Sequence, residues 1–99
     1  IRVDCPDTLK FQLVDQVRTQ LAAYLAEGQP VGASNLRMRE LVTIDGVRAI
    51  FEDGWGLIRA SNTQPALVLR FEAPSPARLD VIRATIETEL AQARRVLSV

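Results

Sequence analysis

The chain has 99 residues, of which 47% are apolar and 24% are charged, a composition typical of one globular domain. Twelve basic residues balance twelve acidic ones, so no net charge attracts nucleic acid or an anionic membrane surface. Histidine is absent and Cys5 is the single cysteine, which excludes an internal disulfide, the usual zinc sites and histidine-based triads. This composition argues against a self-contained enzyme.

The chain opens on an alternating pattern typical of a strand, Ile1-Arg2-Val3-Asp4, without an initiator methionine. We therefore expect a single domain over residues 1–99 that comes from a longer protein. The alternative is a small protein that was processed or freed of a tag. No apolar run approaches the roughly 20 residues of a membrane span, and no signal peptide opens the sequence.

A long first helix is predicted after a strand over residues 1–5. Pro6-Asp7-Thr8 interrupts the strand pattern and offers Asp7 or Thr8 as the N-cap. Gly28 is expected to end this helix, and residues 28–35 are predicted to form a loop. Between these limits apolar residues recur at helical spacing: Leu9, Leu13, Val14, Val17, Leu21, Tyr24 and Leu25.

Residues 39–72 predict consecutive strands at 41–44, 47–52, 55–60 and 66–72. Asp45-Gly46 is the preferred sequence of a two-residue type I′ turn between the first two. Asp53-Gly54 indicates a second turn, and residues 61–65 indicate a polar loop. Consecutive hairpins of this kind predict an antiparallel sheet.

The register of the first hairpin follows from its turn. A two-residue connection at positions 45 and 46 places Ile44 opposite Val47 and Val42 opposite Ala49. These four side chains then share one face of the sheet with Phe51.

Ser75 is expected to cap a second helix that has Pro76 at its first position. Its apolar residues step by three and four: Leu79, Ile82, Ile86, Leu90, Ala93 and Leu97. The predicted order is β-α-β-β-β-β-α. It indicates an α+β fold, a two-layer sandwich in which two helices cover one face of an antiparallel sheet of four to five strands.

Residues 54–65 concentrate what a phosphate site requires, namely several convergent donors and a fixed positive charge. Arg59 supplies the charge and a two-pronged donor. Ser61 and Thr63 add hydroxyls, and Asn62 adds an amide and tolerates a backbone that turns N–H groups inward as an anion-binding nest. Pro65 ends the loop without using a donor.

The residues alone leave other interpretations open. Ser, Asn, Thr and Pro are also the ordinary residues of a polar hairpin loop, and composition alone favours that interpretation. Trp55, between two glycines, is expected to be a core aromatic whose glycines admit a close neighbour. Arg70 would be unfavourable if buried unpaired, so a nearby carboxylate or a supporting role behind the site is expected.

Three segments resemble the C-terminal domain of the α-D-phosphohexomutases, closest to the bacterial bifunctional phosphomannomutase/phosphoglucomutases: residues 45–48, 54–63 and 67–73. The resemblance extends in outline over nearly the whole chain. Its specific core is Arg59-Ala60-Ser61-Asn62-Thr63, which favours a phosphate loop over a plain hairpin turn. Asn62 indicates the mannose/glucose branch, because the phosphoglucosamine mutase branch tends to carry a Ser-Gly-Thr loop.

The resemblance implies a sandwich similar to TATA-binding-protein-like domains, as the fourth domain of a cytoplasmic isomerase. In that family a phosphoserine in the first domain exchanges its phosphoryl group with a hexose phosphate through a bisphosphate. Magnesium is held in the second domain, and the third reads the sugar. The implied ligands are the 1- and 6-phosphates of mannose and glucose and their bisphosphates. The implied partners are the other three domains, with no nucleic acid and no membrane.

Carried over by position, the resemblance assigns the contacts with the non-reacting substrate phosphate to Arg59, Ser61, Asn62 and Thr63. Arg59 would be the charged clamp, and the hydroxyls and amides would complete the cradle. The resemblance places no catalytic residue and no metal ligand in this chain. This domain alone is therefore expected to be inactive, and Mg²⁺ is expected only in the rest of the parent enzyme.

Other functions stay open at this stage. One is the phosphoglucosamine mutase branch of the same family, and another is a stand-alone regulatory module that binds a phosphorylated metabolite. A third is a nucleic-acid binder, suggested by eleven arginines among the twelve basic residues. Equal acidic content and the lack of an aromatic stacking series argue against the third.

Overall fold

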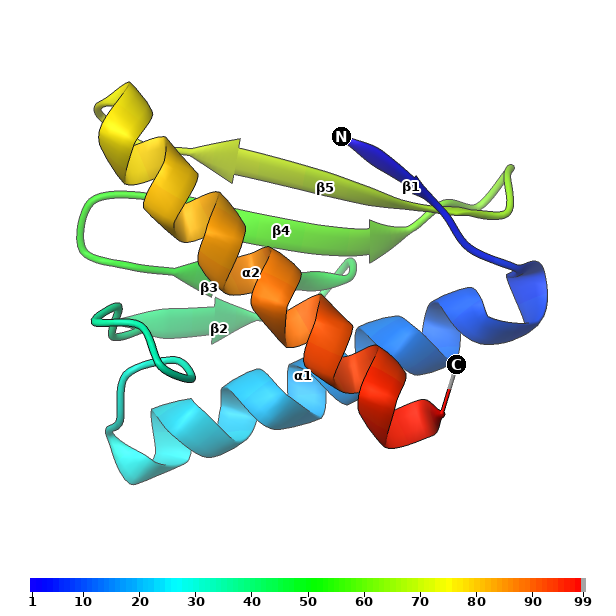
Figure 1. Cartoon of the computed structure of the whole chain (residues 1–99), viewed down its shortest axis with the longest axis horizontal. Coiled ribbons are helices and arrows are strands. Elements are labelled where there is room, and N and C mark those ends of the chain that lie inside the picture. The colour runs from blue at the N-terminus through cyan, green and yellow to red at the C-terminus, as the bar shows by residue number, and fades with distance from the viewer. Residues whose placement is uncertain (99) are drawn as a thin grey trace.

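The computed structural model describes residues 1–98. Within them the chain forms five strands and two helices: β1 (Arg2–Asp4), α1 (Asp7–Glu27), β2 (Glu40–Val42), β3 (Val47–Ile50), β4 (Trp55–Ala60), β5 (Ala66–Glu72) and α2 (Pro76–Leu97). This confirms the predicted order. In Figure 1, α2 crosses in front of the sheet and α1 runs below it. Both helices pack against the strands, including β4 and β5, so the two-layer α+β sandwich is confirmed as well.

The strands form one antiparallel sheet in the order β1-β5-β4-β3-β2. The first strand therefore lies at an edge beside the last one, with Val3 opposite Leu67. Strand β4 occupies the centre and pairs along its whole length with β5, from Trp55↔Glu72 to Ala60↔Leu67. The polar loop between β4 and β5 thus lies next to the end of β1, where Asp4 is opposite Ala66.

The core fills the space between the sheet and the two helices. The predicted stripe on α2 is confirmed from Ile82 to Leu97, while Leu79 is half-buried outside the core cluster. The stripe predicted on α1 is wrong at Leu25, which is 37% exposed. Each step of four residues turns about 40° beyond a full turn in a helix of 3.6 residues per turn. The apolar residues from Leu9 to Leu25 are spaced by four, so the last of them has rotated away from the buried face. The best-buried core side chains from the two layers are Leu13, Val17, Leu21, Val47, Ala49, Ile58, Leu67, Leu69, Ile82, Ile86 and Ala93.

The two helices begin differently. Ser75 caps α2 as predicted, because its Oγ accepts a hydrogen bond from Arg78 N at 3.2 Å, and Pro76 is the first helical residue. The cap predicted for α1 is wrong. Its N-cap is Pro6, whose carbonyl accepts from the amides of residues 9 and 10, so the helix closes one turn with no side-chain cap and Asp7 already lies inside it.

The predicted register of the β2–β3 hairpin is also wrong. The observed pairs are Leu41↔Ala49 and Val42↔Arg48, so Leu41 faces the helices, and four residues, 43–46, connect the strands. Ile44 is 95% exposed. A type I′ turn needs positive φ at both central residues, but only Gly46 has it, with φ of 76°.

Trp55 does not belong to the core, contrary to the prediction. It lies on the sheet face away from the helices, where Nε1 donates to Glu72 Oε2 at 2.7 Å and Arg48 stacks 4.6 Å from the ring centroid. The expected close neighbour of its flanking glycines is confirmed: a Cβ on Gly56 would lie 2.7 Å from Ile86 Cγ1 in α2. Because side chains alternate along a strand, the inward Gly56 turns Trp55 outward.

A polar contact joins the two helices. Gln20 Nε2 donates to the Glu89 carboxylate at 3.1 Å and to the Glu89 carbonyl at 3.0 Å. Glu89 is buried, a position that the apolar periodicity of α2 does not predict. Burial raises the pKa of the neighbouring Tyr24 phenol, and the charge of Glu89 raises it further.

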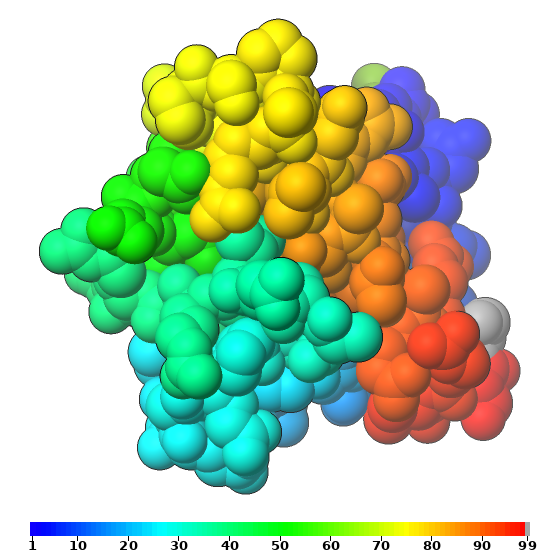
Figure 2. Space-filling view, turned by 60° about the vertical axis from the view of Figure 1, so that its left-hand side comes forward, coloured from blue at the N-terminus to red at the C-terminus, as the bar shows by residue number. Residues whose placement is uncertain are grey.

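The predicted loop at residues 28–35 is present and continues to residue 39. Figure 2 shows it, cyan to green, beside the first half of α2, yellow to orange. Its buried anchors are Val31 and Leu36, which share a backbone hydrogen bond of 2.8 Å. Within residues 1–98, neither helix combines the length and the apolar character that crossing a membrane requires.

We predict that Gly46→Ala destabilises the fold more than Gly28→Ala. Both glycines have left-handed backbones, so alanine costs about 1–2 kcal/mol at either position. A Cβ at Gly28 meets open space, whereas at Gly46 it would lie 2.4 Å from the carbonyl oxygen of Ile58. Urea denaturation should therefore give an unfolding free energy lower by a further ~1–3 kcal/mol for Gly46→Ala. Equal losses in the two variants would contradict this close contact.

Candidate anion-binding site

The loop of residues 61–65 connects β4 to β5 at the end of the sheet where β1 leads into α1 (Figure 1). Backbone hydrogen bonds hold its two ends. Ser61 N donates to Ala66 O at 2.9 Å, and Cys5 N donates to Pro65 O at 2.8 Å. The loop is therefore anchored both in the central hairpin and by the segment between β1 and α1.

The Ser61 side chain organises the loop from within. Its Oγ accepts hydrogen bonds from Thr63 N at 3.3 Å and from Gln64 N at 3.2 Å. A hydroxyl oxygen that accepts in this way still has its own proton to donate. Asn62 and Thr63, both exposed, form the tip, so the predicted polar residues gather in one short turn.

Arg59 lies two residues before this turn, on the outward face of β4. Its side chain is 38% exposed, and Nη1 lies 3.4 Å from Asp45 Oδ2 in the β2–β3 connection. Asp45 itself is 69% exposed, and such a surface pair contributes about 0–1 kcal/mol. The guanidinium is thus oriented, with most of its donors still free for an anion.

Arg59 also borders a hollow of about 510 Å³ on the outward face of the sheet. Arg48 and Arg70 line the same hollow, so three guanidinium groups face one carboxylate there, that of Asp45. The carboxylate partner expected for Arg70 is not found: across residues 1–98 none lies within 4.0 Å. Arg70 is exposed, so water solvates its charge and the expected burial cost does not arise.

Sequence reasoning missed Lys10, which lies under the loop. This residue is 5% exposed, and its Nζ donates to the carbonyl oxygens of Ser61 at 2.6 Å and Gln64 at 3.1 Å. It also lies 2.8 Å from Asp7 Oδ1. The Asp7–Lys10 spacing of three residues predicts that ion pair, but nothing local predicts the contact with a loop some fifty residues away.

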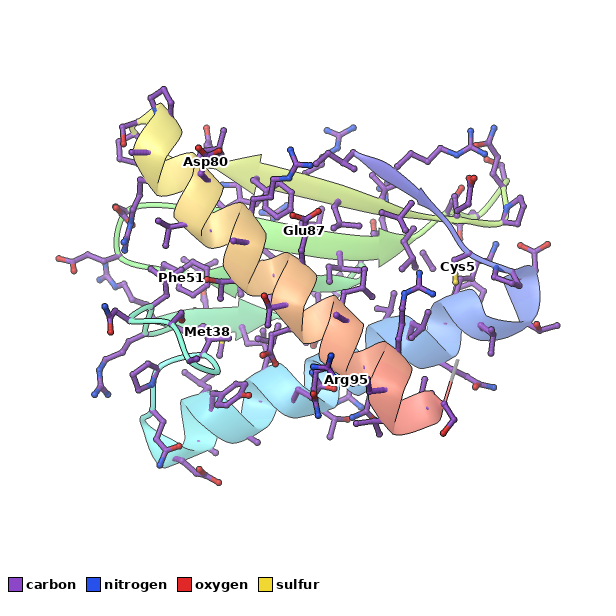
Figure 3. The ribbon with its side chains drawn as sticks, in the orientation of Figure 1. Cys5, Met38, Phe51, Asp80, Glu87 and Arg95 are labelled. Carbon is purple, nitrogen blue, oxygen red and sulfur yellow. The ribbon has the colours of Figure 1, made fainter. Side chains whose placement is uncertain are left out.

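Cys5 lies at the same end of the molecule, as Figure 3 shows. It is 2% exposed, and burial raises the pKa of its thiol, an effect that the charges of Arg94 and Lys10 partly offset. Cys5 packs in the hydrophobic core, and a buried thiol with a raised pKa is less readily converted to the reactive thiolate.

The side chains of the loop suit an anion and not a cation. Arg59, Ser61 and Asn62 present N–H and O–H donors, whereas a metal ion requires converging carboxylate, imidazole or thiolate ligands. Over the described residues 1–98, no three His, Cys, Asp or Glu side chains come close enough to hold a metal.

Fold and loop together define a class: an α+β sandwich whose central hairpin ends in a donor-rich loop next to an arginine. Residues 1–89 match the family model described as the phosphoglucomutase/phosphomannomutase C-terminal domain. The chain belongs to this family.

Individual relatives agree with that family. A phosphomannomutase/phosphoglucomutase of Pseudomonas putida is 43% identical over 90 residues, covering 91% of this chain and 17% of the relative. A probable phosphoglucosamine mutase of Methanopyrus kandleri is 33% identical over 94 residues, covering 86% of this chain and 18% of the relative. A crystal structure of a phosphoglucomutase/phosphomannomutase family protein from Burkholderia thailandensis aligns over 95% of this chain and 17% of its own, with 33% identity and a TM-score of 0.68. The chain thus spans less than a fifth of each of these relatives.

We predict that Ser61→Ala leaves the chain folded and loosens the turn. The amides of Thr63 and Gln64 lose their acceptor, and a neutral hydrogen bond is worth about 0.5–1.5 kcal/mol, so they should exchange with water roughly 2- to 10-fold faster. Thr63→Ala is the matched control, because the Thr63 hydroxyl makes no hydrogen bond within the described residues. Water-exchange NMR measures both variants. Equal exchange in the wild type and Ser61→Ala would refute the role of Ser61.

Proposed function

We propose that this chain binds the phosphate group of a hexose phosphate as the C-terminal part of a phosphomannomutase/phosphoglucomutase. That enzyme would interconvert hexose 1-phosphate and hexose 6-phosphate through a bisphosphate. The observation that carries the proposal is the loop itself. A guanidinium, a serine hydroxyl that accepts from the amides of the turn and two further polar side chains follow one another within five residues, 59–63, in a chain that belongs to this family.

The role of the loop is to hold the phosphate that does not react. Arg59 provides charge-assisted hydrogen bonds, and Ser61, Asn62 and Thr63 provide neutral ones. None of these groups is placed to make or break a bond, so the contribution to rate comes from orienting the substrate and from binding energy remote from the reacting atoms.

The chemical step would depend on other parts of the parent chain. A phosphoserine, magnesium and sugar-reading residues are expected in its other three domains, and magnesium would there assist transfer of the phosphoryl group. This chain would supply one wall of the cleft and carry no catalytic residue. By itself it should therefore give no mutase turnover.

A second assignment within the family has one observation in its favour. The match to a probable phosphoglucosamine mutase covers 86% of this chain, although at 33% identity against 43% for the phosphomannomutase/phosphoglucomutase of Pseudomonas putida. The phosphate loop would serve the same purpose in either enzyme, because the sugar would be read elsewhere. Asn62 in the middle of the loop supports the mannose/glucose branch.

We predict that binding follows the phosphate and not the sugar. In NMR titrations of this chain, glucose 1-phosphate, glucose 6-phosphate and mannose 1-phosphate should shift the same backbone amides, those of residues 61–64, and free glucose should shift none. Because the loop contacts the ligand from one side only, we expect dissociation constants in the millimolar range, a binding free energy of about −4 kcal/mol. Shifts centred on residues 28–35, or a response to free glucose, would show that the site lies elsewhere.

We predict that Arg59→Ala weakens binding more than Thr63→Ala. Charge-assisted hydrogen bonds contribute about 1.5–3 kcal/mol each, and neutral ones about 0.5–1.5 kcal/mol. The affinity for glucose 1-phosphate should fall at least about tenfold for Arg59→Ala, as should kcat/KM in the parent enzyme. Arg83→Ala is the matched control, since it removes an equal charge from α2. Unchanged affinity in Arg59→Ala would remove this residue from the site.

A further inference from the structure

The only lysine of the chain is held under the loop of residues 61–65. Lys10 lies in the first turns of α1 and is almost fully buried, with 5% of its surface exposed. Its ammonium contacts three oxygens, two of them carbonyls of the loop and the third on Asp7. An ammonium has three N–H donors, so these contacts use all of them.

The two carbonyls belong to Ser61 and Gln64, on either side of the tip of the loop. Because both oxygens accept from a buried ammonium, they point toward α1 and away from the exposed tip. A peptide carbonyl carries partial negative charge and would repel an anion if it faced the site. The amides of Thr63 and Gln64 are meanwhile gathered around Ser61 Oγ. Gln64 O also accepts from Ala66 N at 2.8 Å, so Lys10 and this amide together hold the acceptors on the side of the loop that faces α1.

From this geometry we infer that Lys10 is a positioning residue of the phosphate site. It holds the backbone of residues 61–64 in the conformation that receives the anion, and it does not touch the anion itself. The inference rests on the phosphate-binding function proposed above for the loop.

Lys10 acts by holding the loop carbonyls in place and not by attracting the anion over a distance. Asp7 lies 2.8 Å from Nζ and cancels the charge of the ammonium, so the pair presents little net field to the tip of the loop. Arg59, by contrast, acts on the anion through an exposed charge. Salt screens exposed charges within about 10 Å at 0.1 M, whereas it leaves a buried hydrogen-bonded support nearly unchanged. The contribution of Lys10 should therefore persist at high ionic strength.

The first test uses the unmodified chain. Because it has one lysine, labelling with [15Nζ]lysine gives a single side-chain ammonium resonance. Titration with inorganic phosphate should shift this resonance with the same dissociation constant as the amides of residues 61–64. A shift of those amides without a shift of the ammonium would overturn the role of Lys10 while leaving phosphate binding intact. No shift of either would instead refute the function proposed for the loop, and the role of Lys10 with it.

The second test compares two variants of α1. Lys10→Met keeps the length of the side chain and removes its donors. Arg18→Met is the matched control, because Arg18 is also paired with an aspartate three residues earlier, Asp15 at 2.7 Å, and it does not contact the loop. Affinity for inorganic phosphate should fall at least about tenfold in Lys10→Met and less than about twofold in Arg18→Met. The tenfold loss should hold at both about 0.05 M and about 0.5 M NaCl.

A purely structural role of Lys10 predicts another pattern. It would lower the unfolding free energy of Lys10→Met and leave phosphate affinity and the free-state amide shifts of residues 61–64 unchanged in the folded fraction. That result overturns the inference. If circular dichroism shows that Lys10→Met does not fold, the lysine resonance of the unmodified chain decides the question.

Discussion

The pairing of β1 with β5 is the constraint on which the site depends. β1 completes the edge of the sheet in the register Asp4↔Ala66, and only two residues, Cys5 and Pro6, separate it from α1. The helix must therefore start directly beside the β4–β5 loop, so Lys10 reaches the loop carbonyls within its first turns. A slip of one residue in this register would move the start of α1 by about 3.3 Å, enough to break both contacts. The geometry of this surface loop thus depends on the pairing of β5, which follows the loop, with β1 from the beginning of the sequence.

The direction of Arg59 follows from the burial of its neighbours. Side chains alternate along β4, so Gly56, Ile58 and Ala60 face the helices while Arg59 faces outward with Leu57. Turning Arg59 inward would expose Ile58, and burying such a side chain is worth about 1.5–3 kcal/mol. Burial of Ile58 and Ala60 in the core therefore fixes the direction of the Arg59 guanidinium, and no strong ion pair is needed to hold it.

Local patterns predicted most of the fold, including the polar loop of residues 61–65, whereas the phosphate-binding role of that loop rests on the family resemblance. Strand β5 and the capped start of α2 were predictable because alternation and a Ser-Pro cap are encoded within a few residues. The errors at the first hairpin, at Trp55 and at Lys10 have non-local causes. The turn at Asp45-Gly46 is widened because Gly46 packs against β4, and Trp55 faces outward because Gly56 must admit α2. Lys10 was missed for the same reason, since a lysine in a helical pattern indicates a solvated surface until the loop that covers it is placed.

The candidate site combines a loop backbone held by buried hydrogen bonds with an arginine that stays partly exposed. Under the proposed function, this combination suits a phosphate that must be released. Lys10 holds the underside of the loop through buried hydrogen bonds, so the donors stay aimed while nothing is bound. Arg59 stays partly hydrated, and its pair with Asp45 at 3.4 Å is too weak to compete with a dianion. Under the proposed function the two phosphates of one bisphosphate take turns in this loop. A deeply buried arginine would bind each more tightly and release it more slowly, because affinity differences appear mainly in the dissociation rate. Under the proposed function, an open loop with oriented donors would therefore bind phosphate less tightly and exchange it faster, as a substrate that reverses its orientation would require.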